Sequence, residues 1–389
     1  MPKTIPSRSA LILIVIAQFL GTSLWFAGNA AAPALEALLG QTGLVSIITS
    51  AVQLGFITGT LFFAFLSIPD RFSPSRVFFV SAVLASVCNF SITILPTSLS
   101  TILILRFLVG FFLAGIYPVG MKIASDYFEK GLGSALGFLV GALVLGTASP
   151  FLLKALEISI SWKLIFWSTS AFAILGGMLI GFGVPDGPFR KASPKFDPGI
   201  IPALARNNPL KGAAAGYFGH MWELYTFWAF LPFLIQSLKN ESAIDSTNSL
   251  WTFLIISAGA VSCALGGLIS LKKGSEKVAL VSLFGSGICC LVLLISPEMP
   301  AWALFAFLMV WGILVVADSP QFSTLVAQSI LPEHRGTALT LVNCIGFGLT
   351  ILSIQLANYL SGMLAPSLYL GLLVLGPISG LLMYRFFRS

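Results

Sequence analysis

Charged residues are scarce in this chain. Asp, Glu, Lys and Arg make up 9% of the 389 residues, whereas hydrophobic residues make up 57%. A soluble globular domain carries about 25% charged residues, so a chain this poor in charge cannot cover a water-facing surface. The scarcity excludes a protein built of ordinary soluble domains and indicates that most of the surface faces lipid.

Histidine and cysteine are also few, with two His and five Cys in the whole sequence. All five cysteines fall within apolar runs, as expected of packed thiols and not of a disulfide framework or a zinc site. The sequence has no His-Glu-x-x-His motif, no Gly-x-Ser-x-Gly motif and no nucleotide-binding loop. These absences argue against an enzyme and against ATP-driven chemistry. We expect no cofactor, no resident metal and no nucleic-acid partner.

What the sequence has in abundance is long apolar runs. A transmembrane helix needs about 20 apolar residues, and Pro, Gly or charged residues mark the breaks between such runs. The pattern predicts an all-α membrane protein with twelve transmembrane helices, at residues 9–39, 44–68, 76–95, 98–127, 132–156, 162–183, 209–237, 247–270, 276–296, 300–330, 336–361 and 366–386.

The longest interruption divides the chain into two halves. Residues 184–208 hold five Pro and several charges, which predicts a linker between six-helix bundles at 1–183 and 209–389. A weak internal repeat supports the division, because Gly110 and Pro118 have the spacing of Gly312 and Pro320. Shared spacing, order and topology favour duplication.

The distribution of cations predicts the orientation. With the N-terminus inside, 17 of the 21 Lys and Arg lie on the cytoplasmic side. Three lie outside (Lys154, Lys163 and Lys239) and Arg106 lies within a helix. The positive-inside rule therefore predicts that both termini and the linker are cytoplasmic. We expect a monomer in the plasma (inner) membrane.

Two stretches of the sequence carry a recognisable pattern. Asp70, Arg71 and Arg76 lie between the second and third predicted helices, and in the fourth helix Arg106 is followed by small residues, including Gly110. In both stretches the chain resembles the major facilitator superfamily: the first matches that family's Asp-Arg signature, although its usual glycines are missing, and the second has its spacing of small residues.

The resemblance implies a secondary transporter that moves a small solute by alternating access. It places the first, fourth, seventh and tenth helices around a central cavity and makes Asp70, Arg71 and Arg76 a conformational gate. A loose likeness to antiporters of the family lies in the glycines and proline of residues 137–150. We favour export over uptake.

Four ionisable residues fall deep inside predicted helices: Arg106, His220, Glu223 and Asp318. A charge in hydrocarbon costs about 2.5 to more than 10 kcal/mol, so such groups persist where they meet water, a partner or a substrate. At 1.5 Å per residue, Arg106 and Glu223 lie near the midplane and could pair, whereas Asp318 lies nearer the cytoplasm.

These four residues are the candidate proton-coupling and substrate-binding groups. A buried Glu can exchange a proton near neutral pH, and His titrates in that range, so Glu223 and His220 are candidate proton sites. Arg106 is suited to bind an anion or to hold a carboxylate. Asp318 precedes Pro320, which frees a backbone carbonyl, and an ion site there is plausible. The alternative for each is a structural ion pair or a packing contact.

Polar and aromatic residues on the same helices are candidate substrate contacts. Each is also the kind of side chain that forms an ordinary interhelical hydrogen bond. They are Trp25, Asn29, Gln53, Tyr117, Trp222, Tyr225 and Asn343.

Other functions remain open at this point. The nearest alternative is a divalent metal transporter with His220, Glu223 and Asp318 as ligands, although the difference in depth argues against one compact site. A non-transporting receptor and an intramembrane enzyme are further alternatives. The expected partners are a small-molecule substrate, protons and the lipid bilayer.

Overall fold

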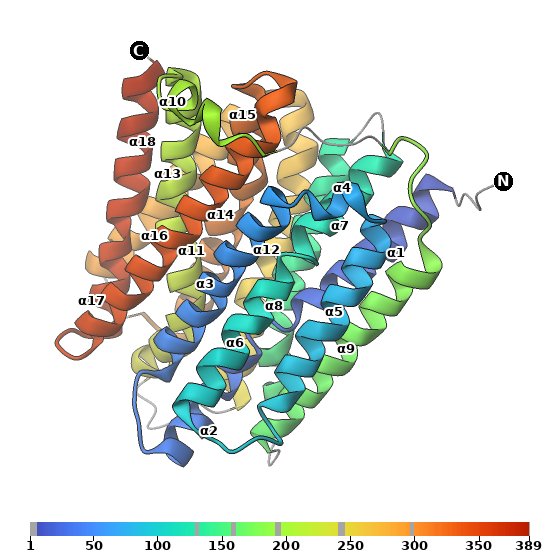
Figure 1. Ribbon diagram of the computed structural model, residues 1–389. Helices are drawn as coiled ribbons and strands as arrows, with labels where there is room; N and C mark the ends of the chain where they lie inside the picture. The colour runs from blue at the N-terminus through green and yellow to red at the C-terminus, as the bar shows by residue number, and fades with distance from the viewer. Residues whose placement is uncertain are drawn as a thin grey trace. The chain divides into compact units, whose positions relative to one another are not determined.

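The computed structural model describes residues 6–128, 132–156, 161–190, 196–239, 246–295 and 299–388 (Figure 1). These residues form helices and their connections, with no strand in the described ranges. In lipid, a helix satisfies its backbone hydrogen bonds within one segment. Eleven helical segments of the described chain are long and apolar enough to span a membrane. A twelfth, α11 (Asn208–Leu238), has 31 residues and is more polar. The predicted all-α, twelve-helix membrane protein is confirmed.

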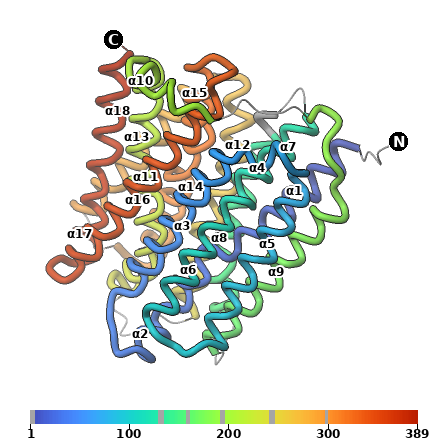
Figure 2. Tube along the Cα trace, in the orientation of Figure 1, coloured from blue at the N-terminus to red at the C-terminus, as the bar shows by residue number. Residues whose placement is uncertain are grey.

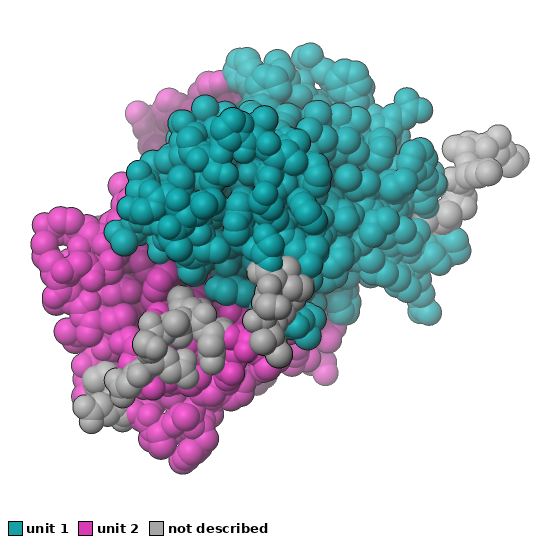
Figure 3. All heavy atoms as spheres, turned by 90° about the horizontal axis from the view of Figure 1, so that it is seen from below, with its two compact units in different colours: residues 1–195 teal, residues 196–389 magenta. Residues whose placement is uncertain are grey.

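The chain forms two compact units, residues 1–195 and 196–389, coloured separately in Figure 3. The division falls within the Pro-rich segment 184–208. Each unit is described by itself.

Unit 1 holds six membrane-spanning segments, and its chain path can be followed in Figure 2. Its helices are α1 (Ser7–Thr22), α2 (Ala27–Leu39), α3 (Leu44–Phe65), α4 (Ile68–Arg71), α5 (Pro74–Ser91), α6 (Leu99–Leu113), α7 (Tyr117–Tyr127), α8 (Leu132–Ala155) and α9 (Trp162–Gly183).

Two spans of unit 1 are interrupted where the sequence predicted continuous helices. The run 9–39 breaks into α1 and α2 because residues 23–26 form a turn. Thr22 and Ser23 donate from their hydroxyls to the carbonyls of Gln18 and Leu20 in the preceding turn, a contact that bends helices. The run 98–127 breaks into α6 and α7, and Pro118 is in the first turn of α7. Proline cannot donate to the turn before it, so the helix restarts there.

Unit 2 contains the remaining helices. They are η1 (Pro198–Ile200), α10 (Ile201–Leu204), α11 (Asn208–Leu238), α12 (Ser246–Lys273), α13 (Ser275–Ile295), α14 (Ala301–Ala317), α15 (Ser319–Gln328), η2 (Pro332–His334), α16 (Arg335–Ser361), α17 (Pro366–Gly371), η3 (Leu372–Val374) and α18 (Leu375–Arg388). The predicted span 300–330 is interrupted at Asp318, between α14 and α15, with Pro320 in the first turn of α15.

The internal repeat seen in the sequence has a structural counterpart in each unit. Gly110 on α6 lies against the backbone carbonyl of Val52 on α3, so closely that a Cβ atom would collide with it. Gly312 on α14 lies in the same way against the carbonyl of Ile255 on α12. Each glycine therefore allows two helices to approach backbone to backbone, and the helix that carries it breaks before the repeated proline.

Candidate functional site

Glu223 is a buried acid of unit 2. It lies on α11 and has no exposed surface. Trp311 Nε1 on α14 donates to Glu223 Oε1 over 2.6 Å, and Ser286 Oγ on α13 donates to Oε2 over 2.8 Å. The Cys290 thiol, also on α13, lies 3.5 Å from Oε1. The carboxyl group thus binds three neutral donors from two neighbouring helices.

His220 and Asp318 form a second buried pair in unit 2. His220 lies one turn before Glu223 on α11, so both side chains project from one face of that helix. His220 Nδ1 and Asp318 Oδ1 are 2.7 Å apart, and both side chains are fully buried. The two atoms are within ion-pair distance, yet their alignment does not meet the geometry of a hydrogen bond. Asp318 is the residue that joins α14 to α15, so the pair links α11 to a helix break.

The two acids and the histidine do not form a metal centre. Within the described ranges, no three His, Cys, Asp or Glu side chains gather in an arrangement that could hold a metal ion. The divalent metal alternative therefore lacks the ligand set of His220, Glu223 and Asp318 on which it was based.

Arg106 lies at the break between α1 and α2 in unit 1. It is fully buried on α6. Its Nη2 donates to the carbonyls of Leu24 and Trp25, over 3.0 and 2.6 Å. Its Nη1 donates to Asn89 Oδ1 over 3.0 Å. These carbonyls lie in the turn that follows the C-terminal end of α1, near which the helix dipole favours a cation. The guanidinium group therefore caps the interrupted helix.

Asn89 extends this network to another helix of unit 1. Its Nδ2 on α5 lies 2.9 Å from Ser170 Oγ and 3.1 Å from Thr169 Oγ1, both on α9. The sequence predicted that Arg106 and Glu223 could pair. In the structure, the hydrogen bonds described for Arg106 lie within unit 1, and those described for Glu223 lie within unit 2.

Three of the predicted substrate contacts lie together in unit 1. Trp25 is in the turn between α1 and α2, Asn29 is on α2, and Gln53 is on α3; all three are buried. Asn29 Nδ2 donates to Thr49 Oγ1 over 2.7 Å. Tyr117 begins α7 and is half-buried.

The predicted contacts of unit 2 face different neighbours. Tyr225 on α11 packs its ring against Phe347 on α16, with centroids 5.4 Å apart. The ring of Trp222 lies against Gly376 on α18. Asn343 on α16 is half-buried.

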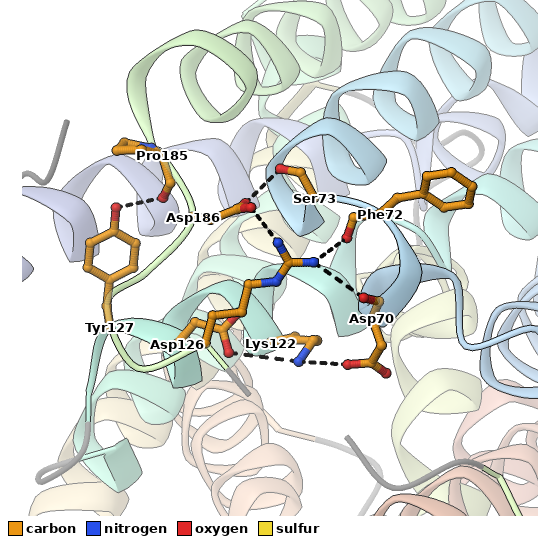
Figure 4. Close-up of polar contacts among 9 residues, drawn as sticks. Asp70, Phe72, Ser73, Lys122, Asp126, Tyr127, Pro185 and Asp186 are labelled. Atoms are coloured by element: carbon orange, nitrogen blue, oxygen red, sulfur yellow. Dashed lines mark hydrogen bonds and ion pairs between the residues drawn. The ribbon is translucent and has the colours of Figure 1, made fainter. Parts of the chain in front are cut away.

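A polar cluster in unit 1 joins α4 and the turn before α5 to α7 and to residues 185–190 (Figure 4). Lys122 Nζ on α7 lies 3.0 Å from Asp70 Oδ1 and 3.8 Å from Asp126 Oδ1. Both acids are shown beside the lysine in Figure 4. The predicted gate residue Asp70 therefore has a partner in unit 1, whereas Arg71 and Arg76 are exposed.

The segment that follows α9 completes this cluster. Arg190 donates to Asp186 Oδ2 over 2.5 Å and to the carbonyl of Phe72 over 2.8 Å. Ser73 Oγ donates to Asp186 Oδ1 over 2.6 Å. Tyr127 on α7 donates from its hydroxyl to the carbonyl of Pro185 over 2.7 Å. These hydrogen bonds attach residues 185–190 to α7 and to the turn between α4 and α5.

Sequence reasoning missed the partners of the candidate residues. Trp311, Ser286 and Cys290 surround Glu223, but nothing in their own sequence context marks them as its donors. Asp186 and Arg190 are four residues apart but lie in a non-helical segment, so the helical pairing rule could not predict their ion pair.

Comparison with known proteins decides the family. A sequence profile described as the Major Facilitator Superfamily matches residues 13–354. The chain belongs to the major facilitator superfamily. It is a membrane transporter and not an enzyme.

This superfamily member is also similar to individual proteins. It is 27% identical over 165 residues to the "Inner membrane transport protein YnfM" of Escherichia coli (strain K12). That match covers 40% of this chain and spans only 37% of the relative's length. A solved bacterial homologue of the human lysosomal transporter Spinster, in an inward-facing and occupied conformation, covers 99% of this chain and 98% of its own, with a TM-score of 0.69 and 14% identity. At that identity the likeness shows the shared fold.

Proposed function

We propose that this superfamily member is a secondary transporter that moves a small solute by alternating access, coupled to protons through unit 2. The observation that carries the proposal is the set of three titratable side chains buried inside membrane-spanning helices of that unit: His220, Glu223 and Asp318. Ionisable groups at such depth are costly and mark substrate or proton pathways in membrane proteins.

The surroundings of Glu223 suit a group that changes its protonation state. Its three donors are neutral, so no cation among its hydrogen-bond partners holds it permanently charged. The carboxylate accepts all three hydrogen bonds, and the protonated acid can return one to the Ser286 hydroxyl, which both donates and accepts. The His220–Asp318 pair, with Nδ1 and Oδ1 2.7 Å apart, is the second candidate proton site.

The other candidate residues are assigned to the solute and to the gate. The proposed solute contacts in unit 1 are Trp25, Asn29, Gln53 and Tyr117. Asp70 would stabilise one access state through its ion pair with Lys122, with Arg71 and Arg76 on the same loop. The contacts proposed for unit 2 are Trp222, Tyr225 and Asn343.

The test is solute flux into proteoliposomes with and without an imposed pH gradient. The solute is one selected by thermal stabilisation of the purified protein, since a ligand that binds the folded state raises its apparent stability. Wild-type protein should accumulate it only with the gradient. Glu223→Gln, which fixes the neutral form, should retain exchange and lose gradient-driven accumulation.

Glu276→Gln is the matched control, because Glu276 carries the same side chain at the exposed start of α13. It should keep the wild-type response. If Glu223→Gln concentrates the solute as wild-type protein does, per folded molecule, the proton site is misassigned. If wild-type protein shows no flux with any stabilising solute, the result contradicts the proposed transport and favours the alternative of a non-transporting receptor.

The proposal includes the orientation. The relative named above is an inner membrane protein, and the cation distribution favours cytoplasmic termini. A cysteine replacing Arg206, which is exposed, should resist an impermeant thiol reagent in intact cells. One replacing the exposed Ser161 should react. The opposite pattern would reverse the orientation. We further propose a monomer, to be checked by light scattering in detergent.

A further inference from the structure

Unit 1 buries amide groups that have no hydrogen-bond partner. Gln53 has no exposed surface, and neither its Oε1 nor its Nε2 has a partner among the described residues. Asn29 uses its Nδ2 on Thr49, while its Oδ1 has none there. A buried polar atom left unsatisfied costs about 1–3 kcal/mol. Such atoms in a folded protein require an explanation, and a ligand or a water is the usual one.

These groups converge on one place. Thr49 and Gln53 are one turn apart on α3 and share a face of that helix. Asn29 on α2 is hydrogen-bonded to Thr49. Trp25, in the turn between α1 and α2, precedes Asn29 by four residues. The rings of Trp25 and Phe56, which follows Gln53 by three residues on α3, are 4.9 Å apart. We call Trp25, Asn29, Thr49 and Gln53 the amide site.

The amide site has no acid to meet a cation. Every acidic residue in the described part of unit 1 lies near a helix end or in a connection: Glu36, Asp70, Asp126 and Asp186. A cationic group would therefore lose its hydration without gaining a counter-charge from the described residues of unit 1, at a cost of several kcal/mol.

Arg106 contacts the amide site through the carbonyl of Trp25. Arg106 has committed both terminal nitrogens to Asn89 and to the carbonyls of Leu24 and Trp25. Its Nε lies beside Gly28, where a Cβ atom would be 3.1 Å away, and this Nε has no hydrogen-bond partner among the described residues. The four side chains of the amide site are themselves neutral, and they present both donors and acceptors beside the rings of Trp25 and Phe56.

We propose that the amide site binds an uncharged hydrogen-bonding group of the solute, a carboxamide or hydroxyl, and that the rings of Trp25 and Phe56 pack against the apolar part beside it. A carboxamide matches the orphan atoms, because it donates to Asn29 Oδ1 and Gln53 Oε1 and accepts from Gln53 Nε2. The inference rests on the proposed transport function, since buried atoms are reached by a solute only when the helices around them part.

The test uses three isosteric probes on the purified full-length protein. Benzamide, benzoate and benzamidinium share one ring and a planar head, and they carry charges of zero, minus one and plus one. Affinity is measured by isothermal titration. Benzamide should bind wild-type protein more tightly than either charged probe. Gln53→Leu should weaken benzamide binding at least tenfold, or about 1.4 kcal/mol.

Gln18→Leu is the matched control. Gln18 on α1 is fully buried in the same unit, and both its amide atoms also lack partners among the described residues. Its Oε1 lies directly against Gly120, away from the amide site. Gln18→Leu should leave benzamide affinity within twofold of wild type. If Gln53→Leu fails to fold, Gln53→Met keeps the length of the side chain and serves in its place.

Three results would overturn the inference: tighter binding of a charged probe, equal effects of the Gln53 and Gln18 substitutions, or no benzamide binding at millimolar concentration. The titrations need no membrane gradient. Gradient-driven flux without benzamide binding would therefore overturn the amide site alone. Benzamide binding that depends on Gln53, in a protein whose flux ignores the gradient, would overturn proton coupling alone.

Discussion

The indole of Trp311 donates a hydrogen bond to Glu223 across 2.6 Å, and this bond joins α14 to α11 inside unit 2. The same indole stacks on Phe227, with ring centroids 4.3 Å apart. One side chain thus orients the buried acid and packs the helix that carries it.

Trp311→Phe separates these two roles, because Phe keeps an aromatic ring and lacks the N–H. We expect the free energy of unfolding to fall by about 1–3 kcal/mol, since a buried carboxyl oxygen loses a donor. Thermal unfolding in detergent is the measurement. Trp302→Phe is the control, because Trp302 is 76% exposed. Equal melting temperatures for the two variants would mean that the bond contributes no stability.

Arg106→Lys retains the charge at the α1–α2 break but cannot reproduce the planar set of bonds. A lysine presents one nitrogen, whereas Arg106 reaches Asn89 with one terminal nitrogen and two carbonyls with the other. We expect a loss of about 2–4 kcal/mol in unfolding free energy, because hydrogen bonds to a charged group contribute about 1.5–3 kcal/mol each. Arg76→Lys, at an exposed position, should unfold like the wild type. A stable Arg106→Lys protein would show that the cap is dispensable.

Asp70→Asn removes the ion pair with Lys122 and leaves the amide site intact. The pair is largely shielded from solvent, with exposed fractions of 17% and 14% for the two side chains. We expect hydrogen–deuterium exchange in residues 66–73 to quicken about fivefold, which corresponds to about 1 kcal/mol. Benzamide affinity should not change. Glu333→Gln, on an exposed carboxylate, should leave exchange there unaltered. Unchanged exchange in Asp70→Asn would remove Asp70 from the proposed gate.

Gly110→Ala tests the backbone contact between α3 and α6. The added methyl group collides with the Val52 carbonyl, which cannot move without its helix. We expect a loss of about 1–3 kcal/mol, as for overpacked cores. Gly348→Ala has open space around the new methyl group and should be neutral or slightly stabilising, since Ala favours a helix over Gly. Equal stability of the two variants would contradict the close approach.

The sequence predicted the helices well and their interruptions poorly. Apolar runs and Pro-rich breaks located all twelve spans, because lipid demands long helices with few charges. The break at residues 23–26 was missed, since it depends on hydroxyls that bond to the preceding turn and on Arg106, which is distant in sequence. The break at Asp318 had a signal in Pro320, which the helix prediction set aside.

Prediction of the candidate site stopped at single residues. Charge and depth singled out Arg106, His220, Glu223 and Asp318, and the structure brings His220 and Asp318 to 2.7 Å. The neutral donors around Glu223 escaped notice because Ser, Cys and Trp are common in membrane helices. Only tertiary packing shows which of them meets a carboxylate.

Arg106 binds main-chain oxygens at positions 24 and 25, and such a contact is indifferent to the side chains those positions carry. Substitution of Trp25 can therefore reshape the surface beside Asn29 and Gln53 while the kink in the first span persists. Under the proposed role of the amide site, a change at position 25 should alter solute preference and leave this helix geometry unchanged.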